Sequence, residues 1–173
     1  QRTSGFIDKM VELLNKKGIK TAVTGHDKFK NDVNEADAKV VIEVRVPAQV
    51  DDAAGKTEAS TVLEKEDTVA IYGSNEFAAK AIINANGGFK ESKLGADKIL
   101  AVGFDSGALQ QDAIRKGIFV GSVTQDPVQI GYQAVKLAIA AAKGETVKDV
   151  DTGSKWYDAK NIDSEEIKAL LYE

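Results

Sequence analysis

The sequence predicts an α/β fold in which a parallel sheet is flanked by helices. Short apolar runs alternate along the chain with longer segments of helical periodicity, which is typical of parallel sheets covered by helices. The clearest run, Ile99–Phe104, carries no charge and ends at Asp105. It predicts a strand buried on both faces. Composition agrees, because 43% of the 173 residues are hydrophobic and 29% are charged, as in an ordinary folded domain.

The N-terminal part of the chain predicts a helix and two candidate strands. Gly5–Lys17 has apolar residues on one helical face, and Gly18 stands where glycine is favoured after a helix. The candidate strands are Lys20–Thr24 and Val40–Val46. The polar segment Gly25–Ala38 between them predicts a loop with a short helix.

The rest of the chain continues the alternation of strands and helices. A short buried strand is expected before the third helix, and an edge strand and a packed tail at the end. The expected elements are, in order, a helix capped by Asp51 and Asp52, the strand Thr68–Gly73, the helix Glu76–Ala85, the strand Ile99–Phe104, the helix Ala108–Lys116, the strand Ile118–Thr124, the helix Pro127–Lys143, the strand Asp151–Tyr157 and the tail Ile162–Tyr172.

Three of the expected strands are followed by polar residues, Asn75, Asp105 and Gln125. Since the carboxyl ends of parallel strands meet at one edge of a sheet, these side chains are expected to lie together where ligands bind in α/β folds. Two amides and one carboxylate offer donors and acceptors with a single charge, which suits a neutral polyhydroxylated ligand better than a phosphate. The alternative is that they are three unrelated helix caps and turns.

Composition excludes several function classes. A net charge of -4 gives no basic surface for nucleic acid, and the absence of cysteine excludes disulfides, thiol catalysis and cysteine-ligated metals. The single histidine, His26, lies in a polar loop and is expected to be solvated there. Neither a Gly-x-Gly-x-x-Gly nor a Gly-x-Ser-x-Gly motif is present, so we expect no enzyme, no catalytic residue, no metal and no cofactor.

The helix expected at Pro127–Lys143 is apolar on two sides. One stripe holds Ile130, Ala134, Leu137, Ala138 and Ala141, and the other holds Val128, Tyr132, Val135, Ile139 and Ala142. Such a helix docks against more than its own sheet.

Five motifs together resemble the ribose-type periplasmic sugar-binding proteins of ABC transporters. They are Arg2–Phe6, Pro47–Asp51, Gly73–Glu76, Gly103–Ser106 and Gly121–Gly131, in the family's order. The resemblance implies a Rossmann-like lobe of the two-lobed type I fold, specifically the C-terminal lobe. It also implies sugar contacts by Arg2, Asn75, Asp105 and Gln125. At Val50 the family usually has an aromatic ring, so a stacking platform is either lost or supplied elsewhere.

The resemblance divides the chain by role. Residues 1–125 would form the sugar-binding lobe, 126–145 the crossover helix that packs on the N-terminal lobe, and 146–173 the return strand and tail. The segment Gly25–Ala38 has the character of an insertion, because the family needs one strand there. Of the two candidates we favour Val40–Val46 as the sheet strand, since it leads into the Pro47–Asp51 motif.

The functional expectation is a solute-binding protein for a neutral pentose or hexose that delivers it to a membrane permease. The chain begins at Gln1, so we expect an excised or mature product, periplasmic or extracellular and membrane-anchored, with its signal sequence removed. An isolated lobe would bind sugar weakly, and its crossover helix would be covered by the missing N-terminal lobe or by a second copy in a domain-swapped homodimer. The alternative is the effector-binding domain of a lactose-repressor-type regulator.

Overall fold

The computed structural model describes residues 1–172, which form two compact units. The first unit is Gln1–Glu58 and the second begins at Ala59. This boundary differs from the division by role, 1–125, 126–145 and 146–173, which stays a prediction.

The first unit contains both candidate strands. Helix α1 (Arg2–Lys16) is followed by β1 (Thr21–Thr24), a 3₁₀ turn η1 (Glu35–Asp37) and β2 (Val40–Glu43). β1 and β2 pair in parallel from Thr21 opposite Val40 to Thr24 opposite Glu43. Choosing one strand over the other was therefore wrong, because each supplies the backbone hydrogen bonds of its neighbour. β2 ends three residues before Val46, at the point where its pairing with β1 ends.

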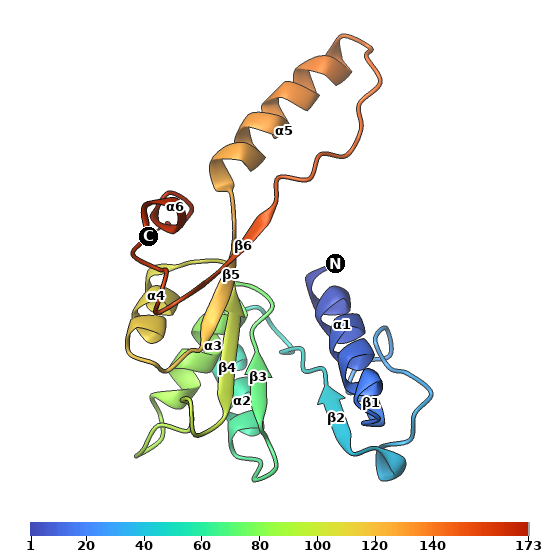
Figure 1. Cartoon of the computed structure of the whole chain (residues 1–173), viewed down its shortest axis with the longest axis vertical. Coiled ribbons are helices and arrows are strands. Elements are labelled where there is room, and N and C mark those ends of the chain that lie inside the picture. The colour runs from blue at the N-terminus through green and yellow to red at the C-terminus, as the bar shows by residue number, and fades with distance from the viewer. Residues whose placement is uncertain (173) are drawn as a thin grey trace. The chain divides into compact units, whose positions relative to one another are not determined.

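A four-stranded sheet forms the centre of the second unit (Figure 1). Its order is β3-β4-β5-β6, with the first three strands parallel and β6 antiparallel to β5. The strands are β3 (Ala70–Tyr72), β4 (Leu100–Phe104), β5 (Gly121–Gln125) and β6 (Ser154–Asp158). The predicted α/β class, a mainly parallel sheet with flanking helices, is confirmed.

The core of this unit joins the sheet to its helices. The helices are α2 (Asp52–Leu63), whose last five residues belong to this unit, α3 (Glu76–Asn86), α4 (Ala108–Arg115), α5 (Pro127–Ala142), which adds no buried residue, and α6 (Glu165–Lys168). The core contains Leu63 of α2, Ile82 of α3, Ile114 of α4 and Ile167 of α6, together with Ala101 of β4. Burial of these apolar side chains supplies most of the favourable free energy of folding.

The expectation that the strand Ile99–Phe104 is buried on both faces was wrong, and so was the expectation of a buried strand at Thr68–Gly73. In β4, Ala101 is fully buried, whereas Leu100 is 43% exposed. β3 has no buried residue, and Val69 just before it is 74% exposed. A strand without charged residues can be buried on both faces, but whether both faces are covered depends on the helices that pack there.

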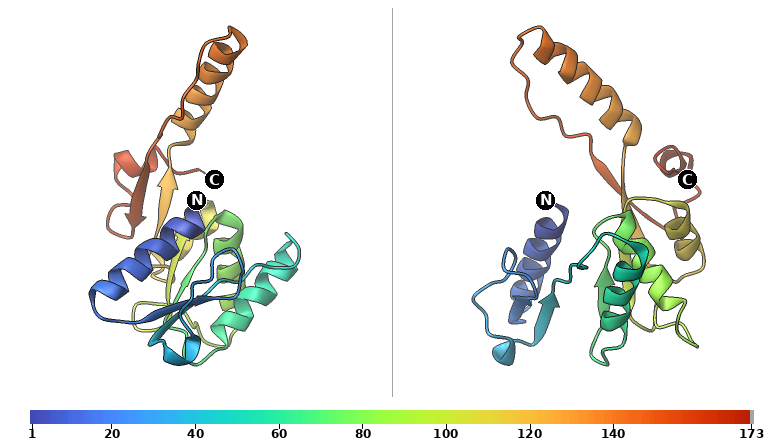
Figure 2. Two further views of the ribbon diagram at one scale, coloured as in Figure 1. Left: turned by 90° about the vertical axis from the view of Figure 1, so that its right-hand side faces the viewer. Right: turned by 180° about the vertical axis from the view of Figure 1, so that it is seen from behind.

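Helix α5 begins at Pro127, as expected, behind the cap residue Asp126, whose carboxylate accepts a hydrogen bond from the Gln129 amide at 2.8 Å. It has no buried residue, and Val128, Tyr132 and Val135 are 70%, 61% and 62% exposed. Figures 1 and 2 show it extending away from the sheet of its own unit.

A matched pair of substitutions tests this core. Leu63→Ala removes a side chain that is 1% exposed, and we expect it to lower the free energy of unfolding by about 2–5 kcal/mol through transfer and cavity costs. Leu109→Ala makes the same change on α4 where leucine is 47% exposed, and about 0.5 kcal/mol is expected. Urea unfolding followed by fluorescence of Trp156, on β6, measures both. Equal effects would contradict the packing of α2 in this core.

Candidate functional site

The carboxyl ends of three neighbouring strands carry the predicted site residues of the second unit. Asn75 lies in the turn between β3 and α3, Asp105 follows β4 directly, and Gln125 is the last residue of β5. β3 pairs with β4 and β4 with β5, so the three residues share one edge of the sheet. The structure thus places them together, as the sequence predicts.

Asn75 is a helix cap as well as an edge residue. Its side-chain oxygen accepts a hydrogen bond from the Ala78 amide at 2.8 Å, which satisfies an unpaired donor in the first turn of α3. The cap alternative therefore holds for Asn75. It commits the side-chain oxygen to the helix, so the amide nitrogen is the group that would donate to a ligand.

Asp105 has the most unusual backbone of the edge. Its φ of 74° makes it the one non-glycine residue of 1–172 in the left-handed region. Aspartate tolerates this conformation better than most residues, but it still costs free energy. Strained backbone of this kind persists where surrounding contacts over-determine it, and it is concentrated at functional sites.

Those contacts converge on the Asp105 carbonyl oxygen. Tyr157 Oη donates to it at 2.8 Å, Ser122 Oγ at 2.9 Å and Gln110 Nε2 at 3.3 Å. The Asp105 amide in turn donates to the Val123 carbonyl at 2.7 Å. Three donors from α4, β5 and β6 therefore hold one peptide group at the end of β4.

A glycine within β4 makes room for this cluster. A Cβ on Gly103 would meet Gln110 Nε2 at 2.7 Å and Ser122 Oγ at 3.0 Å. A glycine inside a strand marks a close approach of other atoms, so Gly103 was the signal in the sequence for a buried polar cluster. Gln110, Ser122 and Tyr157 themselves are buried, and sequence reasoning did not find them.

The Asp105 carboxylate faces the start of α3. Its Oδ2 accepts a hydrogen bond from the Glu76 amide at 3.2 Å. The helix that the Asp105 side chain caps is thus the preceding one, α3, whereas α4 has Gly107 at its cap position, without a side-chain hydrogen bond. This bond satisfies one of the unpaired amides at the start of α3.

The other predicted site residues lie in different structural elements. Gln125 pairs with Ser154 of β6 and is half-buried. Arg2 and Val50 belong to the first unit. Arg2 is the first residue of α1 and is partly buried, and Val50 lies in the loop before α2 with 86% of its surface exposed.

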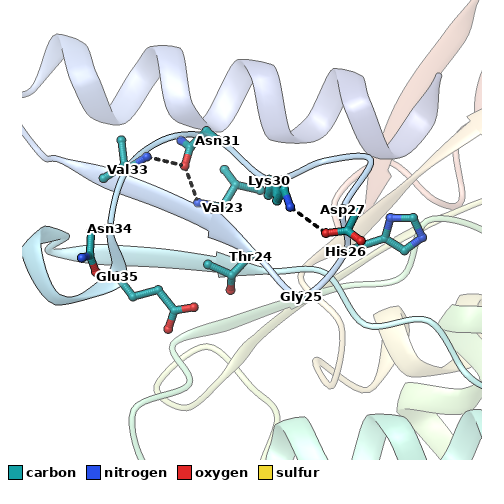
Figure 3. Close-up of a pocket in the computed structure, with 10 residues that line it drawn as sticks. All are labelled: Val23, Thr24, Gly25, His26, Asp27, Lys30, Asn31, Val33, Asn34 and Glu35. Atoms are coloured by element: carbon teal, nitrogen blue, oxygen red, sulfur yellow. Dashed lines mark hydrogen bonds and ion pairs between the residues drawn. The ribbon is translucent and has the colours of Figure 1, made fainter.

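A polar cavity of about 500 Å³ lies in the first unit, at the carboxyl end of β1 (Figure 3). Asn31 anchors its wall, because its side chain bonds the Val23 amide at 3.0 Å and the Thr21 carbonyl at 3.1 Å. His26 is half-buried beside Phe29 and accepts a hydrogen bond from the Lys28 amide, so it is less solvated than expected. None of Arg2, Val50, Asn75, Asp105 or Gln125 lines this cavity.

Among residues 1–172, no three His, Asp or Glu side chains are grouped so that they could hold a metal ion. No helix in the same range combines the length and apolar character needed to cross a membrane.

The sequence model of a protein family, the periplasmic binding protein domain, matches residues 3–146 of this chain. The chain belongs to the periplasmic binding protein family. A comparison with curated protein sequences gave no match. Among solved structures, one described as an ABC transporter, LacI family transcriptional regulator from Brachyspira murdochii is 36% identical, with a TM-score of 0.72 over 99% of this chain and 65% of that one.

Two further structures of the periplasmic binding protein fold resemble the chain. An ABC transporter solute-binding protein from Agrobacterium vitis with bound D-fucose is 25% identical, with a TM-score of 0.70 over 99% of this chain and 62% of that one. A carbohydrate transporter solute-binding protein from Agrobacterium radiobacter with D-arabinose is 21% identical, which shows the fold alone, with a TM-score of 0.64 over 99% and 62%. The chain therefore spans less than two thirds of the length of these relatives.

Substitutions at Asp105 test the strained backbone. Asp105→Asn keeps both the tolerance for left-handed backbone and an oxygen that accepts from the Glu76 amide, so stability close to the parent is expected. Asp105→Ala loses both, and we expect the free energy of unfolding to fall by about 1–2 kcal/mol. Denaturant unfolding of the two variants checks this. If the alanine variant were as stable as the asparagine variant, position 105 would not be strained.

Tyr157 predicts an alkaline loss of stability. Burial, with smaller contributions from Tyr172, Asp105 and Glu76, raises the pKa of the Tyr157 phenol to about 12. Between the unfolded-state value near 10 and this folded-state value, only the native chain keeps the proton. Stability should therefore be intact below pH 10 and then fall by about 1.4 kcal/mol per pH unit. Denaturant titrations from pH 9 to 12 measure this slope. Tyr157→Phe should lack the part of the slope that comes from ionisation of the Tyr157 phenol. An equal slope in that variant would show that Tyr157 does not cause the loss of stability.

Proposed function

We propose that this chain is the sugar-binding C-terminal lobe of a solute-binding protein that serves an ABC transporter, with a neutral pentose or hexose as ligand. Asp105, at the carboxyl edge of the sheet, carries the proposal, because its backbone is left-handed and its carbonyl oxygen accepts three hydrogen bonds. Asn75 and Gln125 lie at the ends of the neighbouring strands. The bound D-fucose and D-arabinose of the related structures support the sugar class.

The chemistry of the edge fits a hydroxylated ligand. Sugar hydroxyls both donate and accept hydrogen bonds, and the edge offers a carboxylate that accepts and amides that donate. A charge-assisted bond to Asp105 would be the strongest of these contacts. We also propose Arg2 as a charged group for sugar contact. Val50 would give apolar contact without the stacking of an aromatic ring. The protein would bind and release its ligand without covalent chemistry.

In the whole protein the ligand would lie between two lobes that close by a hinge motion, and the closed form would engage the permease. The protein would then lie in the periplasm, or outside the cell on a membrane anchor. A single lobe would present part of the contacts and leave the sugar open to water. We therefore propose weak binding for the chain by itself.

The exposed apolar surface of α5 fits the same proposal. Val128, Tyr132 and Val135 are each more than half exposed, although apolar patches on soluble proteins are normally covered. We propose that an N-terminal lobe covers this surface in the whole protein, and that in its absence a second copy of the chain does so in a homodimer.

Titration of the chain with sugars tests the proposal. D-arabinose and D-fucose are expected to bind with a dissociation constant of about 1 mM or weaker, and to shift the backbone amide resonances of Asn75, Asp105 and Gln125. Asp105→Ala should abolish these shifts, whereas the matched control Leu109→Ala, on the exposed side of α4, should keep them. The proposal fails if neither sugar moves these resonances at 100 mM, or if inorganic phosphate moves them equally.

A second candidate is the effector-binding domain of a lactose-repressor-type regulator. The description of the Brachyspira murdochii structure, which names both an ABC transporter and a LacI family regulator, favours keeping it. The segment that precedes residue 1 in the parent gene decides between the two. A signal peptide supports transport, and a helix-turn-helix supports regulation.

A further inference from the structure

The last described residues of the chain are hydrogen-bonded to the same sheet edge. Thr124 Oγ1 donates to the Leu170 carbonyl at 3.2 Å, and Gln111 Nε2 donates to the Tyr172 carbonyl at 2.9 Å. Tyr172 Oη donates to Glu76 Oε2 at 3.1 Å. We call Leu170–Tyr172 the C-terminal strap. These bonds connect it to β5, α4 and α3.

Each of these hydrogen bonds leads to a residue that is adjacent in sequence to a proposed ligand residue. Two bonds do so directly, and the third does so through the side chain of Gln111. Glu76 follows Asn75, and Thr124 precedes Gln125. Gln111 Nε2 also donates to the carbonyl of Ser106 at 2.7 Å, and Ser106 follows Asp105. The strap is thus linked to all three strand ends at the position next to the side chain that would meet the sugar.

Glu76 is the residue where the strap and the site meet. Its backbone amide donates to the Asp105 carboxylate, and its side chain accepts from Tyr172. The Glu76 side chain lies against Gly107, where a Cβ would clash with the Glu76 carboxylate. Glycine at position 107 therefore permits the arrangement that the strap holds.

Tyr172 is suited to this contact at neutral pH. Burial, and to a smaller degree the carboxylates of Asp105 and Glu76, raise the pKa of its phenol. The hydroxyl therefore stays protonated and donates to Glu76, and the bond is charge-assisted because the acceptor is a carboxylate.

We infer that Tyr172 is a positioning residue for the proposed sugar site. Through Glu76 it fixes the first turn of α3 against the Asp105 carboxylate, so that Asn75 and Asp105 are held in place before a ligand arrives. This inference rests on the proposed function for its ligand, but the positioning itself is a property of the unliganded chain.

The test removes the Tyr172 hydroxyl and measures hydrogen exchange of the Glu76 backbone amide. Tyr172→Phe keeps the ring and loses the donor, so hydrogen exchange of the Glu76 amide in the sugar-free chain should quicken about tenfold. Exchange of the Ala101 amide, in the core of β4, reports the accompanying loss of global stability, and the Glu76 amide should be affected at least as strongly. Tyr132→Phe, on the exposed surface of α5, is the matched control and should leave both amides unchanged.

Substitutions at Glu76 complete the test. Glu76→Gln retains a side-chain oxygen that can accept from Tyr172, so the backbone amide at position 76 should exchange within about threefold of the parent rate. In Glu76→Ala this amide should exchange as fast as it does in Tyr172→Phe. The double variant Glu76→Ala/Tyr172→Phe should exchange no faster than Glu76→Ala. Additive effects, or an unchanged Glu76 amide in Tyr172→Phe, would overturn the inference.

Sugar titration separates this inference from the proposed function. If D-arabinose binds, Tyr172→Phe should weaken it about threefold to tenfold, and unchanged affinity would overturn the role in binding. If no sugar binds the parent chain, the proposed function fails. The exchange result then still decides whether the strap positions the first turn of α3.

Discussion

The structure of the second unit depends on the peptide carbonyl of Asp105 and the three donors that hold it. Left-handed backbone at a residue with a side chain is unfavourable, so it requires partners that make every alternative worse. Tyr157, Ser122 and Gln110 supply these partners from β6, β5 and α4. Strand β6 is therefore joined to the carboxyl end of β4 by a side-chain hydrogen bond in addition to its backbone pairing with β5.

The same cluster has a cost. Gln110 is 1% exposed, and its Oε1 is a buried side-chain atom for which the described chain provides no hydrogen-bond partner. A buried acceptor without a partner destabilises the fold, since it loses water and gains nothing in return. An apolar residue at this position would avoid that cost, but it would leave the Asp105 carbonyl with two donors. The polar core at this point is consistent with a site that needs a defined carboxylate position.

Two surfaces of the second unit are apolar and exposed, namely α5 and the face of β4 that carries Leu100. A fold that leaves such surfaces open is expected to bury them in a larger assembly. This chain spans 65% and 62% of the first two related structures. Sugar binding at the edge and burial of α5 are thus two aspects of one proposed architecture.

By itself the sequence determined the fold class, most element boundaries and the gathering of Asn75, Asp105 and Gln125, since apolar periodicity and strand ends are local properties. Only the tertiary structure decided that Thr21–Thr24 and Val40–Glu43 pair with each other, and that the Asp105 carboxylate caps α3 rather than α4. It also decided that Tyr157 and Tyr172, distant in the chain, donate hydrogen bonds to Asp105 and Glu76 at this edge. Such contacts depend on which strands and loops are brought together in three dimensions, and spacing along one chain carries no record of that.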